Sequence, residues 1–486
     1  MSHSKAHHRR TGKNRFRAPQ PPSPITNGTY DTDRPFDMCP QRTVNGSEDC
    51  LYLGLYSRPW STQEKLRPVV LTFYGGGFVR GSASFDIPPS AFPVLNVSSS
   101  NDYITVYSNY RTNVFGFLPG SKVASHPDVD LNPGLLDQQA ALKWIQKHIS
   151  KFGGDPNNVT IWGQSAGGGS VVAQTIATGN QGLNLFTKAM TSSPFWPKTP
   201  RYDAPESEAI YQQTLYDVGC TNATDEIACL KSADLQALRE SALRLSTSLQ
   251  YTTSAFTFGP VIDDKFLNTP LSSVIRNEHV NADLVLTSYN LYEGENFIPP
   301  GFANSTTSST DGFNSSSSSF DTWLRGYLPS FTATDIIAVK SLYPPTGSAE
   351  DMSYNTTYTR AGLIYRDVVL ACPAYWLSSS AKKGWVIEYT ISPAKHASDV
   401  QYWNTVGEIQ TTDRATYQGY AGAMASFVQT GDPNMHKVTN GSVVGVPDVE
   451  SRKQFLITSE ELKQGELGML EERCAFWLSV AGRVPI

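Results

Sequence analysis

The sequence predicts a large α/β protein in which helices flank a central, mostly parallel β-sheet. Short apolar runs rich in Val, Ile, Thr and Tyr alternate with stretches of helical periodicity through the first half of the chain. This alternation is typical of parallel βαβ units. Glycine clusters follow two of the apolar runs directly, as they do where a chain turns sharply out of a strand.

Five β-rich runs predict strands, and they lie at residues 67–74, 103–111, 159–163, 284–289 and 385–391. The run at 385–391 is the last strand that we expect. Helical spacing predicts helices over residues 135–153, 165–177, 205–246 and 416–430. The first of these helices is expected to end at Gly153 and Gly154.

The rest of the chain is assigned by its composition. Residues 302–319 are rich in Ser and Thr, which predicts an exposed loop. No linker separates two cores, so we expect a single domain over residues 13–486. Residues 1–12 are expected to form an atypical basic tail.

The charge balance excludes several classes of partner. The chain has 39 Lys and Arg residues against 44 Asp and Glu residues, a net charge of −5 without long blocks. We therefore expect neither nucleic acid nor an anionic lipid surface as a partner. No stretch approaches the roughly 18 apolar residues of a membrane span, which predicts no stable membrane insertion.

Cysteines and glycosylation sequons favour the secretory route. None of the six cysteines forms a Cys-x-x-Cys pair, so the sequence predicts no metal site and implies no organic cofactor. Two close pairs and one distant pair suggest three disulfides, although spacing alone leaves other pairings open. Nine Asn-x-Ser/Thr sequons lie at Asn27, Asn45, Asn96, Asn158, Asn222, Asn304, Asn314, Asn355 and Asn440. The cysteines and sequons together predict an extracellular protein. MSHSKAHHRR has no apolar signal region, so we expect that the natural start of the chain is missing or replaced.

A candidate nucleophile stands between a predicted strand and a predicted helix. The segment GQSAG (163–167) has the pattern G-x-S-x-G, in which glycines permit a sharp turn that exposes the serine at a helix N-terminus. Ser165 is therefore the predicted nucleophile of an acyl-transfer reaction. The alternative is a glycine-rich turn that holds a serine by chance.

Upstream, YGGGF (74–78) follows a predicted strand directly. Glycine lets backbone approach a substrate closely, and acyl transfer needs N–H donors aimed at a carbonyl oxygen. We predict an oxyanion hole formed by the N–H groups of Gly76, Gly77 and Ala166, the residue after the candidate nucleophile. A merely flexible turn is the alternative.

At these residues the chain resembles the type-B carboxylesterase/lipase family, which includes cholinesterases and fungal extracellular lipases. FGGDPNNVTIWGQSAG (152–167) matches the family's nucleophile pattern, and EDCLYL (48–53) matches a second pattern with Gly54 where Asp, Asn or Ser is usual. RFRAPQPP (15–22) and NPGLLDQQAALKWI (132–145) are similar to further family blocks. The resemblance implies an α/β-hydrolase fold and hydrolysis of carboxylic esters. Two departures are Gln164, where Glu is more common, and the apparent absence of the family's N-terminal small sheet.

The base and the acid follow from chain order, which in α/β hydrolases is Ser, then Asp or Glu, then His. Only His396 and His436 come late enough in the chain. His396 follows the strand at 385–391, and HASD (396–399) resembles the family's H-x-x-E/D block, so His396 is the predicted base. His436 lies in a polar turn and is expected to face solvent.

For the acid, NLYEG (290–294) follows the strand at 284–289 and resembles the family's N-x-x-E-G. Glu293 would accept the Nδ1–H of the base and fix its tautomer. Glu295 is the rival carboxylate, and a surface carboxylate without a role is the other alternative. Ser192 aligns with a serine that supports the acid in relatives, and it could equally be an ordinary serine at a strand end.

The resemblance also implies a disulfide pairing. It pairs Cys39 with Cys50, Cys220 with Cys229, and Cys372 with Cys474, all in structural roles.

We thus predict a serine carboxylic-ester hydrolase that works through an acyl-enzyme on a small-molecule or lipid ester. The alternatives are a true triacylglycerol lipase, a non-catalytic cholinesterase-like adhesion protein, and a chain too short at its start to fold. The sequence gives no prediction of oligomeric state.

In relatives the loop between the first two cysteines forms the lipase lid or carries the choline-binding aromatic residue. Here residues 40–49 (PQRTVNGSED) contain no aromatic residue and one apolar side chain, Val44. We therefore predict neither interfacial activation nor a choline preference. The alternative is that aromatic residues elsewhere, such as Phe195 and Trp196, provide those surfaces.

Overall fold

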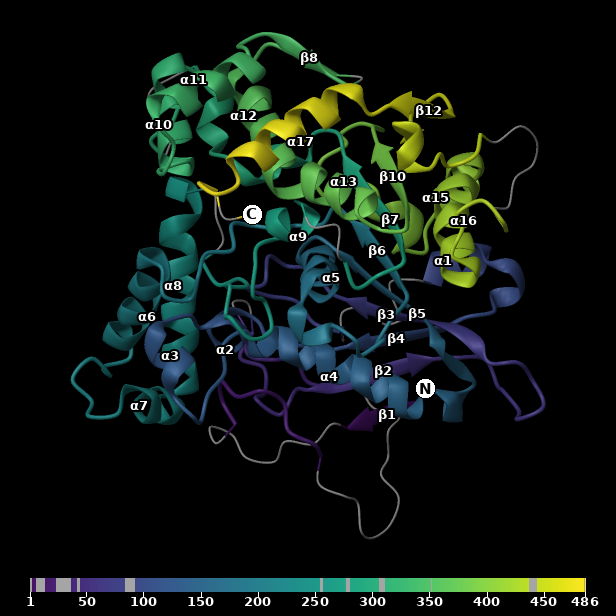
Figure 1. Ribbon diagram of the computed structural model, residues 1–486, viewed down its shortest axis with the longest axis horizontal. Helices are drawn as coiled ribbons and strands as arrows, with labels where there is room; N and C mark the ends of the chain where they lie inside the picture. The colour runs from purple at the N-terminus through teal and green to yellow at the C-terminus, as the bar shows by residue number, and fades with distance from the viewer. Residues whose placement is uncertain are drawn as a thin grey trace.

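A computed structural model describes residues 2–5, 14–22, 36–41, 44–83, 92–253, 257–276, 280–305, 311–350, 352–436, 444–484 and 486. Its strands are β1 (Ser2–Lys5), β2 (Tyr52–Tyr56), β3 (Arg67–Phe73), β4 (Ile104–Ser108), β5 (Gly154–Gln164), β6 (Lys188–Ser192), β7 (Leu284–Asn290), β8 (Gly347–Ala349), β9 (Met352–Tyr354), β10 (Lys383–Tyr389), β11 (Lys453–Ile457) and β12 (Leu462–Glu466). Within the described residues, ten of these strands form one sheet, and β8 pairs with β9 in a separate ribbon (Figure 1).

The sheet is parallel in its centre and antiparallel at its edges. The strand order is β1-β2-β4-β3-β5-β6-β7-β10-β11-β12. All neighbours from β4 to β11 are parallel, and antiparallel pairs join β1 to β2, β2 to β4 and β11 to β12. Central strands are buried on both faces, as a parallel sheet between helix layers requires: Val69, Val70 and Leu71 of β3 are all 0% exposed.

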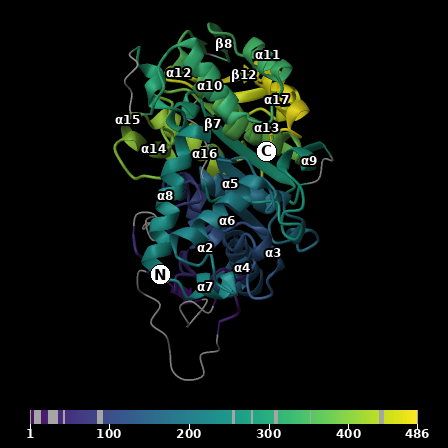
Figure 2. The same cartoon turned by 90° about the vertical axis from the view of Figure 1, so that its left-hand side faces the viewer.

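Helices surround this sheet. The α-helices are α1 (Phe92–Val97), α2 (Asn113–Phe117), α3 (Ser121–Ser125), α4 (Pro133–His148), α5 (Ala166–Ile176), α6 (Pro205–Asp217), α7 (Glu226–Ser232), α8 (Leu235–Thr253), α9 (Leu271–Arg276), α10 (Ser317–Tyr327), α11 (Ala333–Leu342), α12 (Thr357–Arg366), α13 (Cys372–Ser379), α14 (Val400–Trp403), α15 (Ile409–Thr412), α16 (Arg414–Thr430) and α17 (Gly468–Val480). In Figure 1 α4, α5 and α13 lie in front of the sheet, α6 to α8 gather at the left, and α16 lies at the right beside α1. Figure 2 presents α6 and α8 toward the viewer.

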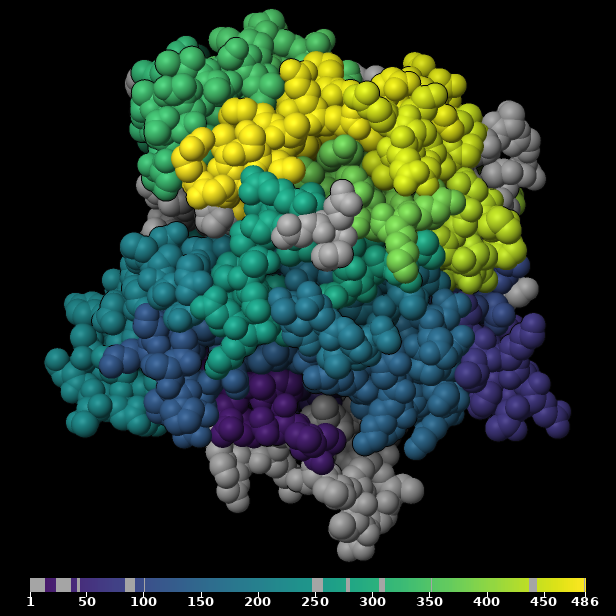
Figure 3. Space-filling view, viewed as in Figure 1, coloured from purple at the N-terminus to yellow at the C-terminus, as the bar shows by residue number. Residues whose placement is uncertain are grey.

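Strand β10 illustrates how the two faces are covered. The ring of Trp385 meets Phe427 of α16 edge-on at 5.9 Å. Its neighbour Gly384 approaches α13 so closely that a Cβ there would lie 2.0 Å from the carbonyl oxygen of Ser378. Alternate residues of the strand therefore face different helices, and one core of buried side chains extends along the chain from Phe16 to Ile486. Figure 3 shows the earlier part of the chain, in blue, in contact with the later part, in green and yellow.

The architecture predicted from the sequence is confirmed, since helices flank a large and mostly parallel sheet. All five predicted strands are present as β3, β4, β5, β7 and β10, although β4 is shorter than expected and β5 begins five residues earlier. The predicted stop of the helix at 135–153 is also found. Helix α4 continues as a short 3-10 turn that ends at Gly153, which has a left-handed φ of 83°.

Three expectations are wrong in detail. Residues 385–391 are not the last strand, because the short apolar run of β11 adds a further parallel strand and the polar β12 pairs with it at the edge. The stretch 205–246 is divided into α6, α7 and α8. The loop expected at 302–319 ends earlier than predicted, because α10 begins at Ser317. The Ser316 hydroxyl caps this helix by accepting the Ser319 N–H. Residues 306–310 of the expected loop lie outside the described residues.

The N-terminal region differs from the expected tail. Ser2–Lys5 form the edge strand β1, which pairs antiparallel with β2, so a short N-terminal strand is present in the sheet. The unusual Gly54 lies in β2, where a Cβ would come within 2.2 Å of the Tyr107 ring. The ring therefore occupies the space that a side chain at residue 54 would fill.

Three disulfides join Cys39 to Cys50, Cys220 to Cys229, and Cys372 to Cys474, the pairs that the resemblance implies. Among the helices that the structure describes, none is both long and apolar enough to cross a membrane.

Candidate active site

Ser165 occupies the turn between β5 and α5. Its backbone has φ 58° and ψ −126°, a strained conformation for a residue other than glycine. The turn requires glycine nearby, because a Cβ on Gly167 would lie 2.1 Å from the carbonyl oxygen of Phe73. The serine N–H donates to the carbonyl oxygen of Ser192 at 3.0 Å, and the side chain is left at the amino end of α5. This is the geometry of a nucleophile elbow.

The glycine turn that follows β3 lies against this serine. A Cβ on Gly75 would be 3.1 Å from the Cβ of Ser165. Gly76 and Gly77 have φ of 114° and 65°, and a Cβ on Gly76 would lie 2.3 Å from the carbonyl oxygen of Arg80. None of the hydrogen bonds found among the described residues uses the N–H of Gly76 or Gly77, so both donors remain available.

Two stacked tyrosines hold the strand end before this turn. The rings of Tyr74 and Tyr110 lie 4.2 Å apart at 12°. The Tyr110 hydroxyl donates to the carbonyl oxygen of Tyr74 at 2.7 Å, and the Tyr74 hydroxyl donates to that of Tyr110. Burial raises the pKa of both phenols, so both remain protonated donors. The pair fixes the backbone from which the glycine turn starts.

The predicted base and acid are hydrogen-bonded to each other. His396 Nδ1 lies 2.8 Å from Glu293 Oε2, although the residues are 103 positions apart in the sequence. Glu293 is fully buried, and its other oxygen accepts the N–H of Asn290 at 3.0 Å. An ionised carboxylate can only accept hydrogen bonds, so the imidazole proton is assigned to Nδ1 and Nε2 carries the lone pair that a base needs.

Gln164 contacts the other ring nitrogen. Its Nε2 is 3.4 Å from His396 Nε2, which places the imidazole beside the residue that precedes Ser165. With the Nδ1 proton on the Glu293 side, the amide N–H of Gln164 is the donor in this contact. The sequence identified Gln164 only as a departure from the family pattern; its contact spans 232 positions and could not be read from the sequence.

The loop that carries His396 is held by residues that the sequence reasoning gave no role. Asn290 donates to Asp399 at 3.0 Å and to the Lys395 carbonyl at 2.8 Å. Buried Asp399 also accepts from Trp403 Nε1 at 2.9 Å, and the His396 N–H donates to Asn296 Oδ1 at 3.1 Å. The signal for Asp399 was present, because it is the last residue of the HASD block.

The turn that carries Glu293 packs against α12. A Cβ on Gly294 would lie 1.9 Å from the Gly362 carbonyl oxygen, and Arg366 donates to the Leu291 carbonyl at 3.2 Å. Arg366 is itself buried and paired with Asp367 at 2.8 Å. These contacts hold the turn that carries Glu293 against α12.

The remaining candidates lie apart from this pair. Glu295 is 3.4 Å from Lys395 Nζ, so the rival carboxylate has its own ion pair. The buried Ser192 hydroxyl accepts from Trp162 Nε1 at 3.2 Å, and no hydrogen bond in the described part of the chain joins it to Glu293. His436 is exposed, as the sequence predicted.

Aromatic rings line the far side of the imidazole. Phe297 meets His396 edge-on at 5.0 Å and stacks on Phe195 at 5.3 Å and on Tyr365 at 5.2 Å. Trp196, like Phe195, is fully buried. No group of three or more His, Cys, Asp or Glu side chains suited to a metal ion occurs in the ranges described above.

The chain is similar to esterases and lipases in sequence and in structure. The family model described as "Carboxylesterase family" matches residues 9–477. Carboxylesterase patB of Penicillium expansum is 32% identical over 450 residues, covering 89% of this chain and 75% of that protein. Secreted lipase 4 of Gibberella zeae is 29% identical over 510 residues, covering 96% and 85%. EstA of Aspergillus niger, a solved structure, has a TM-score of 0.82 at 24% identity over 98% of this chain and 93% of that one, which confirms the α/β-hydrolase fold.

Proposed function

Because this chain belongs to the carboxylesterase family and is a carboxylic ester hydrolase, we propose that it works through an acyl-enzyme on Ser165 with His396 as base and Glu293 as acid. The observation that carries the proposal is the 2.8 Å hydrogen bond between His396 Nδ1 and the buried Glu293 carboxylate, next to the strained serine turn. A carboxylate in this position orients the ring and stabilises the imidazolium that forms during the reaction.

In the first half-reaction, His396 Nε2 takes the Ser165 hydroxyl proton as the oxygen attacks the ester carbonyl carbon. The N–H groups of Gly76, Gly77 and Ala166 stabilise the resulting oxyanion; the last belongs to the first residue of α5, where backbone donors lack helical partners. His396 then gives the proton to the departing alkoxide, which leaves as the alcohol. Water repeats the sequence on the acyl-enzyme and releases the acid.

The amide of Gln164 must yield for this cycle. In the resting state its N–H faces His396 Nε2 at 3.4 Å, the atom that accepts the serine proton. Once Nε2 is protonated the two groups are both donors, so the amide turns away or presents its oxygen. A family member with Glu at this position would attract the imidazolium instead.

The structure favours an esterase without a mobile lid. In the loop between Cys39 and Cys50, Glu48 forms a two-pronged ion pair with Arg15 at 2.7 and 3.0 Å. Fully buried Gln41 exchanges two hydrogen bonds with the backbone of Gly81 at 2.7 and 2.8 Å. Contacts at both ends tie the loop to the body, which supports hydrolysis of dissolved esters rather than interfacial lipase action.

An extracellular location fits the rest of the molecule. Three disulfides and relatives that are secreted lipases indicate a secreted protein. Among the described residues, five sequon asparagines, Asn45, Asn96, Asn222, Asn304 and Asn355, are exposed, as attachment of a glycan requires.

The test compares the variants Ser165→Ala, His396→Ala and their double mutant in hydrolysis of a short-chain p-nitrophenyl ester. The losses of activity caused by changing residues of one catalytic unit are strongly non-additive, so the double variant should be about as active as the less active single variant. The matched control is His436→Ala, whose side chain is exposed and which should keep its activity. The assignment would be contradicted if the fold loss of the double variant equalled the product of the two single losses, or if His436→Ala lost as much activity as His396→Ala.

A further inference from the structure

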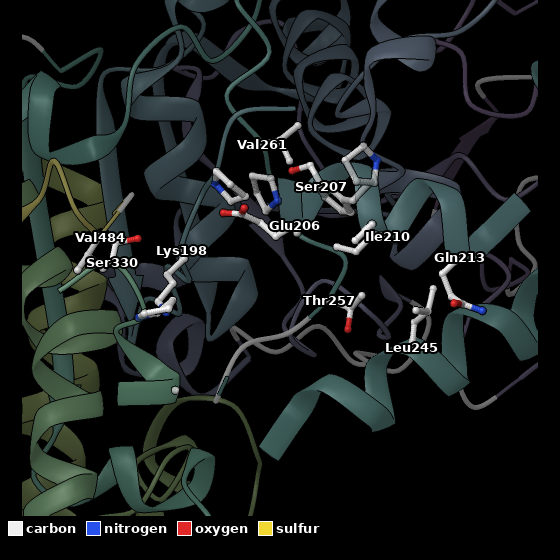
Figure 4. Close-up of a pocket in the computed structure, with 18 of the residues that line it drawn as sticks. Lys198, Glu206, Ser207, Ile210, Gln213, Leu245, Thr257, Val261, Ser330 and Val484 are labelled. Atoms are coloured by element: carbon white, nitrogen blue, oxygen red, sulfur yellow. The ribbon is translucent and has the colours of Figure 1, made fainter. Parts of the chain in front are cut away.

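A cavity lies between α6, α8 and α10, and Ser165 is not among the residues that line it. It has a volume of about 680 Å³. Figure 4 shows it as elongated: Lys198 lies beside Ser330 and Val484 on one side, Ile210, Leu245 and Gln213 lie on the other, and Glu206 lies between. The size is within the range of small-molecule sites.

The charged side chains of its lining differ in whether they have partners. Arg244 pairs with Asp217 at 3.1 Å, and Arg483 pairs with Asp335 at 2.8 Å. Among the residues that the structure describes, Lys198 has no carboxylate within 4.0 Å. Its amine donates to the Tyr327 carbonyl and lies 4.4 Å from the centre of the Tyr327 ring.

Lys198 therefore brings a positive charge into the cavity without an ion-pair partner. Desolvation lowers the pKa of this half-buried lysine to about 8, and the charge of Glu206 acts in the opposite direction. Since Arg244 and Arg483 are each paired with a carboxylate, Lys198 is the cationic side chain of the lining that has none within ion-pair distance in the described part of the chain. An anionic group of a ligand would supply the ion-pair partner that Lys198 lacks.

The rest of the lining is mainly apolar. It includes the buried side chains of Phe117, Leu245, Val261, Leu328 and Val484. Thr257, 9% exposed, also lines the cavity, and its hydroxyl has no hydrogen-bond partner. A buried hydroxyl without a partner is uncommon and marks a place where a bound molecule could complete the hydrogen bonding.

A chain of ring contacts connects Lys198 with His396. From Lys198 the series runs through Tyr327 to Tyr365 at 5.6 Å and to Phe297 at 5.2 Å, which meets His396 at 5.0 Å. None of Ser165, His396 and Glu293 lines the cavity, so the two sites have no candidate catalytic side chain in common.

We propose that this cavity is a second ligand site, which binds a carboxylate carried on an apolar chain, with the carboxylate at Lys198 and the chain toward Ile210 and Leu245. A carboxylate suits a single ammonium that already has one carbonyl acceptor, because charge-assisted hydrogen bonds are the stronger ones. Glu206 nearby disfavours a ligand with more than one negative charge. The acid that ester hydrolysis releases belongs to this chemical class.

The experiment measures binding of decanoate, decan-1-ol and decylammonium to the full chain by calorimetry at pH 6.5, below micelle-forming concentrations. Decanoate should bind, and the alcohol and the ammonium should bind at least tenfold more weakly. Lys198→Met should weaken decanoate at least tenfold, and Glu206→Gln should strengthen it, while the exposed Lys265→Met is the matched control without effect. If Lys198 and Glu206 had only structural roles, Lys198→Met would not weaken decanoate binding while Glu206→Gln strengthened it.

Two further arms locate the site. Decanoate affinity should fall as pH rises above about 8 in the parent, because Lys198 loses its charge there, and should stay constant in Lys198→Met. Reaction of Ser165 with a phosphonate should leave decanoate binding unchanged. If Ser165 did not react with the phosphonate, the result would count against the proposed acyl-enzyme. The comparison of decanoate binding among the Lys198, Glu206 and Lys265 variants would still test the cavity.

Three results would overturn the second site: no decanoate binding, equal binding of acid and alcohol, or loss of decanoate binding on phosphonylation. Since Glu206 is exposed, Glu206→Gln gives a folded variant even if Lys198→Met does not fold.

Discussion

Replacement of Glu293 by Gln removes one charge and leaves the shape of the side chain almost unchanged. In the parent, one carboxylate oxygen accepts from His396 Nδ1 at 2.8 Å and the other accepts the Asn290 N–H at 3.0 Å. The glutamine has one donor and one acceptor for these two positions. If its NH2 group faced the Asn290 N–H, two buried donors would oppose each other at a cost of about 1–3 kcal/mol. The NH2 group therefore faces His396.

That arrangement forces the wrong tautomer. His396 Nδ1 must then accept, so the ring carries its proton on Nε2 and cannot take the proton of Ser165. The expected loss in kcat is roughly 10³- to 10⁴-fold, the scale found when a triad histidine is held in the wrong tautomer. On the transition-state scale this is about 4–5.5 kcal/mol.

The assay is kcat and KM for p-nitrophenyl butyrate, with circular dichroism to verify folding. The matched control is Glu295→Gln, which changes a carboxylate two residues away that pairs with Lys395 at 3.4 Å. That variant should lose less than about tenfold in kcat. Equal losses for the two variants, or more than about a tenth of parental kcat in Glu293→Gln, would refute the role of Glu293.

Two further substitutions and one experiment on the parent protein have expected outcomes. Burial lowers the pKa of Lys188 in β6 to about 7, so the charged amine destabilises the fold at low pH, and stability rises between about pH 7 and the unfolded pKa near 10.5. Lys188→Met should therefore melt at a higher temperature at pH 6 and should lack the stability gain of about 2 kcal/mol that the parent shows between pH 6 and 9. Parallel curves of stability against pH for the two proteins would contradict this. Gln164→Glu places a carboxylate beside His396 Nε2, so the acid limb of the kcat/KM profile should move to higher pH by about one unit, and an unchanged limb would show that the contact has no influence on protonation. Because Glu48 and Arg15 tie down the loop between the first two cysteines, the rate should saturate smoothly as a short-chain ester passes its solubility limit, and a jump when droplets appear would indicate a lipase.

Local features were predictable from the sequence because turn chemistry and side-chain period act over a few residues. The serine turn needs Gly167 for close packing, and that requirement is visible in the five-residue pattern itself. The helix stop at Gly153 and the buried strand β3 follow from the same kind of local rule. Chain order then left His396 and His436, and the place of His396 directly after a predicted strand, together with the HASD block, selected it; in the structure it lies beside Glu293.

Features made by distant segments were not predictable. Strand β11 is a five-residue run and β12 is polar, so neither carries a strong pattern, and only pairing within the sheet reveals them. The contact of Gln164 with His396 joins segments more than 200 residues apart. The cavity beside Lys198 is lined by residues from 117 to 484, and none of them belongs to a motif.

The most direct measurement is the stoichiometry and position of a fluorophosphonate adduct, followed by peptide mass spectrometry while esterase activity is recorded. The account predicts one adduct per chain, on the peptide that contains Ser165, with activity lost in proportion to labelling. His396→Ala should slow labelling strongly, since the serine then lacks its base. Full labelling of Ser165 with activity retained, or inactivation with Ser165 unmodified, would contradict the account.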